Sequence, residues 1–162
     1  MSAEKCCFLV MGVTASGKST VGSLLAKEIG AYFIEADELH SEKNLKKMSS
    51  GKPLTDLDRH DWLLKIKAEV DQKFGAENIV IACSALKQKY RELLGAERYQ
   101  LVYLKTDKIT AKKRLNDRSG HFMPASLINS QFAILEEPAN ALTFDPAMNP
   151  DEIIKKILSN KS

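Results

Sequence analysis

Short apolar runs alternate along the chain with segments in which apolar residues recur at helical spacing. The apolar runs, which predict buried strands, cover residues 6–11, 32–34, 79–83 and 101–104. Between them, apolar positions three or four residues apart predict helices with one buried face. This alternation predicts an α/β fold of three layers, with helices on both faces of a parallel sheet.

Four helices are predicted from the apolar stripes that they would bury. The first would end at Gly30, a typical C-cap residue. The last would begin after Asn149, a favoured N-cap residue, with Pro150 at the first helical position. The stripes are Val21, Leu24, Leu25 and Ile29; Trp62, Ile66, Val70 and Phe74; Leu86, Tyr90, Leu93 and Leu94; and Ile153, Ile154, Ile157 and Leu158.

Two further segments are less regular. Asp107 is predicted to cap a helix that carries Ile109 and Leu115. The stretch 40–58 is polar and contains Gly51-Lys52-Pro53, so it predicts interrupted structure between the second strand and the helix of Trp62.

The residues that join the first strand to the first helix fit the phosphate-loop pattern GxxxxGK[ST]. Gly12 and Gly17 let the backbone curl so that N–H groups point toward phosphate oxygens at the helix N-terminus. Lys18 is expected to reach the β- and γ-phosphates of ATP, and the Ser19 hydroxyl to hold Mg²⁺. An incidental glycine turn would not explain why strand, spacing and helix agree. The predicted nucleotide-binding residues are Gly12, Val13, Thr14, Ala15, Ser16, Gly17, Lys18, Ser19 and Thr20.

A phosphate loop alone does not distinguish a kinase from a GTP-driven switch or a motor ATPase. A switch would carry an Asn-Lys-x-Asp segment that reads guanine, and the sequence contains none. A motor ATPase normally has an acidic residue at the end of a later hydrophobic strand, whereas the run at 79–83 leads into Ser84. The other polar residues of the sequence must therefore identify the reaction.

Two carboxylates follow the second strand, beside the predicted phosphate loop. Ligands of open α/β sheets bind at the carboxyl ends of the strands, where Glu35 and Asp37 fall. If the chain stays extended there, both side chains point the same way. One could orient Mg²⁺-bound water, and the other could accept a hydroxyl proton from a phosphoryl acceptor. The alternative is a solvated acidic loop.

Candidate acceptor-binding residues lie further along the chain. Arg59 stands where a guanidinium could clamp a carboxylate or a hydroxyl, although it could instead form an exposed ion pair with Asp56 or Asp58. His40 and His121 lie beside suspected site segments, but a lone histidine is more often structural.

A mobile lid is predicted at about residues 115–125. Arg114 and Arg118 are four residues apart and lead into a polar segment with Gly120. A kinase needs cations over the transferred phosphoryl group and a cover that excludes water. The alternative is a solvated helix end whose cations favour the helix dipole.

Composition limits the partners. The 162 residues are expected to form a single domain, 1–162. The net charge of +3 is too small to indicate nucleic acid or a membrane surface as a partner. No apolar run approaches the roughly 20 residues that cross a bilayer. Three cysteines without a CxxC pair are typical of a reducing compartment, so a cytoplasmic location is expected.

The chain resembles the gluconokinase family in many separate motifs that occur in order. They are Met11-Gly-Val-Thr-Ala-Ser-Gly-Lys-Ser-Thr20, Asp37-Glu-Leu-His40, Lys43-Asn44, Lys47-Met48, Gly51-Lys-Pro-Leu-Thr-Asp56, Asp58-Arg59, Trp62-Leu63, Cys83-Ser-Ala-Leu-Lys87, Tyr90-Arg91, Leu93-Leu94, Arg118-Ser-Gly-His-Phe122, Gln131-Phe132 and Leu135-Glu-Glu-Pro138. The resemblance implies the nucleoside-monophosphate-kinase-like fold shared with shikimate kinase, and usually a homodimer. It also implies ATP-dependent phosphorylation of D-gluconate at its 6-hydroxyl, giving 6-phospho-D-gluconate for the pentose phosphate pathway.

The resemblance further implies roles for single residues. Asp37 would orient the acceptor hydroxyl, while Lys18 and, from the lid, Arg118 would act on the phosphoryl group. Arg114 would lie along the adenine. The residues implied to bind the acceptor are Asp37, His40, Arg59, Lys87 and His121.

Two residues depart from the family pattern. Ala15 replaces a common glycine of the loop, and Glu35 replaces a common aspartate. Glu35 is one methylene longer, so a contact with Mg²⁺ through water is its expected role. Two other functions remain open: a different small-metabolite kinase of the same fold, similar to shikimate kinase, and a nucleotide-binding module without turnover.

Overall fold

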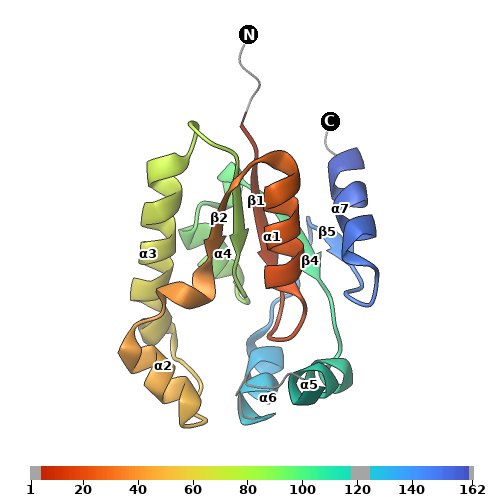
Figure 1. The fold of residues 1–162 in the computed structure, drawn as a ribbon. Coiled ribbons are helices and arrows are strands. Elements are labelled where there is room, and N and C mark those ends of the chain that lie inside the picture. The colour runs from red at the N-terminus through yellow and green to blue at the C-terminus, as the bar shows by residue number, and fades with distance from the viewer. Residues whose placement is uncertain (1–4, 118–124, 161–162) are drawn as a thin grey trace.

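A five-stranded parallel sheet forms the centre of the computed structural model, which describes residues 5–117 and 125–160 (Figure 1). The strands are β1 (Cys7–Met11), β2 (Tyr32–Glu35), β3 (Ile79–Ala82), β4 (Gln100–Leu104) and β5 (Leu142–Phe144), in the order β2-β3-β1-β4-β5. Every neighbouring pair is parallel. The carboxyl ends of all the strands therefore meet at one edge of the sheet, where ligands of such folds bind.

Helices cover both faces of the sheet, which confirms the predicted three-layer α/β fold. Alternation along β1 sends Phe8 and Val10 into the layer below α1 and α7, and Leu9 and Met11 into the layer below α3 and α4. The α-helices are α1 (Lys18–Ile29), α2 (Glu42–Ser49), α3 (Asp56–Lys73), α4 (Gln88–Leu93), α5 (Lys108–Asp117), α6 (Ala125–Ile134) and α7 (Pro150–Ser159). Figure 1 shows α2, α5 and α6 beyond the carboxyl edge of the sheet.

The predicted helix ends are confirmed. Gly30 adopts the left-handed conformation at the C-cap of α1. Asn149 accepts a hydrogen bond from the Asp151 N–H at the start of α7, and the Thr110 N–H donates to Asp107 Oδ1 at 2.6 Å. In the described part of the chain, no helix is long and apolar enough to span a membrane.

Four expectations about elements were wrong or incomplete. Helix α2 forms within the stretch 40–58, capped by the Ser41 hydroxyl, although its one buried side chain is the polar Asn44. Strand β5 was not predicted because it is a three-residue edge strand. Phe74 ends α3 with 45% of its surface exposed, and Ile109 on α5 is 82% exposed, so neither belongs to the buried stripe expected for it.

Candidate functional site

The phosphate loop joins β1 to α1 and has the strained geometry that its glycines allow. Gly17 is the N-cap of α1 with a φ of 93°, in the left-handed region. A Cβ at Gly12 would lie 2.8 Å from the Leu104 carbonyl oxygen, so that position has no room for a side chain. Ala15 also adopts a positive φ, 64°, which gives a physical reason for the glycine common at this point of the family pattern.

Lys18 is the first residue of α1 and folds back over the loop. Its Nζ donates to the Val13 carbonyl oxygen at 3.0 Å, and only 9% of the residue's surface is exposed. The ammonium group is therefore held among the loop's own backbone dipoles. A phosphate bound to the inward N–H groups would lie within reach of this charge.

Ser19 and Glu35 meet at the exposed edge of the loop. The Ser19 hydroxyl donates a short hydrogen bond to Glu35 Oε2. Burial, as the largest effect, raises the pKa of Glu35, and the nearby Asp37 acts in the same direction. A hydroxyl and a carboxylate are hard oxygen donors of the kind that Mg²⁺ takes together with nucleotide phosphates. Among the described residues, no cluster of three or more His, Cys, Asp or Glu side chains could bind a metal by itself.

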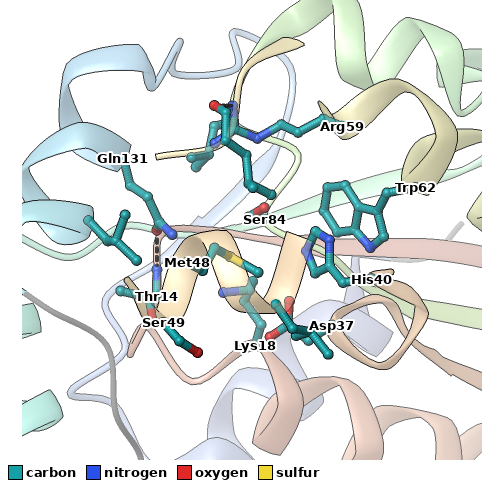
Figure 2. Close-up of a pocket in the computed structure, with 14 residues that line it drawn as sticks. Thr14, Lys18, Asp37, His40, Met48, Ser49, Arg59, Trp62, Ser84 and Gln131 are labelled. Atoms are coloured by element: carbon teal, nitrogen blue, oxygen red, sulfur yellow. Dashed lines mark hydrogen bonds between the residues drawn. The ribbon is translucent and has the colours of Figure 1, made fainter. Parts of the chain in front are cut away.

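A cavity of about 220 Å³ opens beside the loop (Figure 2). It brings together residues from the phosphate loop, the end of β2, α2, α3, α6 and the segment after β3. Its lining residues are Thr14, Lys18, Asp37, His40, Leu45, Met48, Ser49, Leu54, Arg59, Trp62, Ser84, Leu86, Leu127 and Gln131. Five predicted site residues from three distant segments thus line one cavity: Thr14, Lys18, Asp37, His40 and Arg59.

The chain does not stay extended to Asp37, contrary to expectation. A 3-10 helix covers Ala36–Leu39, so Asp37 leaves the line of β2. Trp62 holds this turn, because its Nε1–H donates to the Ala36 carbonyl oxygen at 2.7 Å. The turn keeps Asp37 exposed at the cavity, close enough to Glu35 to raise the pKa of that carboxyl.

His40 stacks on Trp62, with ring centroids 4.1 Å apart and an interplanar angle of 14°. Burial lowers the pKa of His40 to about 4, and the nearby Arg59 adds to this effect while Asp37 opposes it. The imidazole is therefore neutral near neutral pH. A neutral ring can serve a sugar hydroxyl as donor or acceptor.

Arg59 does not form the alternative ion pair with Asp56 or Asp58. Its Nη1 donates to the Leu54 carbonyl oxygen at 2.6 Å and to Tyr90 Oη at 3.3 Å. The two aspartates instead bind lysines: Asp58 binds Lys47 at 2.6 Å, and Asp56 binds Lys87 at 3.0 Å and Lys89 more closely. The guanidinium of Arg59 is thus positioned by neutral oxygens, which leaves its charge available to an anionic acceptor. Lys87 is bound to Asp56 and is absent from the cavity lining.

A second groove adjoins the other side of the phosphate loop. Arg114 crosses it, with Nη1 3.4 Å from the Ala15 carbonyl oxygen and Nη2 2.8 Å from that of Pro146. The groove of about 470 Å³ is lined by Ser16, Gly17, Thr20, Val21, Arg114, Pro146, Ala147, Met148, Asn149, Pro150 and Ile153. Its position fits the base of a nucleotide whose phosphates bind the loop.

The structure adds residues that the sequence did not identify as part of a site. Trp62 was expected in a helix stripe and Ser84 after a strand, and both belong to family motifs to which no role was assigned. Gln131 was part of a family motif without a role, yet its Oε1 accepts a hydrogen bond from the Thr14 N–H at 2.7 Å. Arg118, His121 and most of the predicted lid lie outside the described residues.

The known proteins to which this chain is similar in sequence and in structure are kinases. The shikimate kinase family model matches residues 14–160. A gluconokinase of Gluconobacter oxydans (strain 621H) is 40% identical over 162 aligned positions, which cover 93% of this chain and 88% of that protein. A sugar kinase from Janibacter sp. HTCC2649 superposes with a TM-score of 0.87 at 38% identity, covering 96% of this chain and 93% of that one. A gluconokinase from Sinorhizobium meliloti 1021 superposes with a TM-score of 0.83 at 39% identity, covering 95% and 90%.

Proposed function

We propose that this chain, which belongs to the gluconokinase family, transfers the γ-phosphoryl group of ATP to the 6-hydroxyl of D-gluconate. The products are 6-phospho-D-gluconate and ADP. The observation that carries the proposal is that Lys18 of the phosphate loop and Asp37, the candidate base, line one cavity. A phosphoryl donor and a hydroxyl acceptor held there would meet between them.

The acceptor is held by groups of matching chemistry. Arg59, positioned by the Leu54 carbonyl and Tyr90, binds the carboxylate of gluconate. Asp37 accepts a hydrogen bond from the 6-hydroxyl and takes its proton as the new P–O bond forms. Neutral His40 binds a hydroxyl of the sugar chain, and Lys87, which is bound to Asp56 outside the cavity lining, would join them after exchanging that carboxylate for the acceptor. His121 would join these residues from the lid.

The donor is held by the phosphate loop from Gly12 to Thr20. Lys18 stabilises the negative charge that develops on the phosphoryl oxygens during transfer. Arg118 stabilises the same charge from the lid. Arg114 lies along the adenine. Ser19 and Glu35 form an oxygen site that fits Mg²⁺, with Glu35 acting through water. Mg²⁺ bound there would neutralise charge on the β- and γ-phosphates.

Coupled assays of ADP release with D-gluconate, shikimate and nucleoside monophosphates test the acceptor. Release with gluconate alone is expected, whereas release with either of the others and none with gluconate would refute the proposal. Asp37→Asn removes the base and should lower kcat by about a hundredfold or more. Glu38→Gln, a change at the neighbouring exposed position, is the matched control and should leave kcat unchanged.

The remaining parts of the proposal concern assembly and location. A homodimer in the cytoplasm is expected for a metabolic kinase of this family. Sedimentation of the purified chain tests the first expectation, because a monomer at assay concentration would contradict it.

A further inference from the structure

Gln131 connects α6 to the phosphate loop across 117 residues of sequence. The Thr14 backbone N–H can only donate, so the side-chain atom that faces it must be the amide oxygen. The amide NH₂ group of Gln131 therefore points away from Thr14. Figure 2 shows this contact at the wall of the cavity that Lys18 and Asp37 also line.

The NH₂ group of Gln131 has no acceptor in the described part of the chain. Gln131 is half-buried and belongs to the cavity lining, so its Nε2 can donate to a ligand bound in that cavity. Thr14 lies in the loop that cradles phosphates, and Asp37 marks the acceptor side of the same cavity. A donor beside Thr14 is thus placed where the transferred phosphoryl group would lie.

The position of Gln131 is fixed by how α6 packs. Ile128 and Phe132 of α6 join the hydrophobic cluster that contains Val13 and Ala15 of the phosphate loop. At the other end, the Glu136 N–H donates to the Leu86 carbonyl oxygen at 2.8 Å. The helix is therefore attached both to the loop and to the acceptor-side segment, which keeps a side chain between them in place.

We propose that Gln131 is a further site residue of this reaction, which rests on the proposed function. Its Oε1 positions the phosphate loop through the Thr14 N–H, and its Nε2 donates to an oxygen of the transferred phosphoryl group. In that step the bond from the γ-phosphorus to the bridging oxygen breaks, and ADP leaves with the electron pair. A bond from the acceptor oxygen to the phosphorus forms, and the hydroxyl proton passes to Asp37. Negative charge on the phosphoryl oxygens strengthens the Gln131 hydrogen bond during transfer.

Gln131→Glu separates the two contacts. One carboxylate oxygen still accepts from the Thr14 N–H, but the other replaces the donor with a negative charge toward the phosphoryl group. Gluconate-dependent kcat should fall about twentyfold or more, with unchanged thermal stability. The affinity for a non-hydrolysable ATP analogue should fall by a similar factor in calorimetry, while the affinity for ADP changes little. Protonation should restore the donor, so the activity of this variant relative to wild type should rise as the pH is lowered toward about 5.5.

Two further variants complete the test. Asn129→Asp adds the same charge to an exposed position of α6 and should behave as wild type. Gln131→Met removes both contacts without adding charge, so its kcat should fall and its activity relative to wild type should not recover at low pH. Equal kcat and equal analogue affinity in Gln131→Glu and wild type would overturn the inference. Absence of gluconate-dependent turnover in wild type would instead refute the proposed function. The affinities of Gln131→Glu for the ATP analogue and for ADP would still test the role of Gln131.

Discussion

Protonation of His40 is expected to destabilise the fold between neutral and mildly acid pH. Burial lowers the pKa of this imidazole from 6.5 to about 4 in the folded protein. The unfolded chain therefore binds a proton at a pH where the folded protein does not. Stability is fully present above the unfolded pKa and is lost as the pH falls toward the folded value. Linkage between these two pKa values predicts a loss of about 2 kcal/mol in the free energy of unfolding between pH 8 and pH 5.

This loss can be measured by urea unfolding at a series of pH values. Wild type and His40→Gln are compared. Replacement of the ring removes the stack on Trp62 and lowers stability at every pH, so the informative quantity is the difference in pH dependence. Glu35, whose pKa is raised, opposes His40 within the same range, and comparison of the variant with wild type cancels its effect. His60→Gln changes an exposed histidine of α3 and is the matched control. Equal pH dependence in wild type and His40→Gln would refute the reasoning.

Two other substitutions separate catalysis from stability. Lys18→Met should lower kcat by about a hundredfold or more if the ammonium binds the phosphates as proposed. It should change the free energy of unfolding by less than about 1 kcal/mol, and unfolding of this variant would show that the lysine is structural. Arg91→Met should lower the free energy of unfolding by about 3 kcal/mol in urea, because the carbonyl oxygens of Ala85 and Glu136 lose their donor; a change within about 0.5 kcal/mol would contradict this.

The parts of the fold that could be predicted from sequence are those determined by residues close together along the chain. Four of the five strands are apolar runs because both faces of the sheet are covered. The phosphate loop is equally local, since its glycines, Lys18 and Ser19 are consecutive. Helix α2 has little apolar pattern, since Asn44 is its buried residue, and β5 is too short to show one.

The contacts within the site depend on tertiary structure and could not be predicted. Arg59 lines the same cavity as Lys18 and Asp37, but its partners, the Leu54 carbonyl and Tyr90, include a residue from another helix. Asp37 was expected on an extended chain, whereas Trp62 stabilises a 3-10 turn there. Such pairings join distant segments, and no spacing along the chain encodes them.

Arg91 connects the segment after β3 with the segment after α6 through hydrogen bonds to both. It is only 5% exposed, and its guanidinium donates to the Ala85 carbonyl oxygen at 2.7 Å and to that of Glu136 at 2.9 Å. Burial lowers its pKa, and these carbonyl dipoles compensate for the lost solvation of the charge. Ala85 follows Ser84, which lines the cavity beside Lys18 and Asp37, and Glu136 follows α6, whose Gln131 binds the phosphate loop. Helix α6 is therefore hydrogen-bonded to the phosphate loop through Gln131, and the segment that follows it is held by Arg91 and Leu86 against the cavity wall at Ser84.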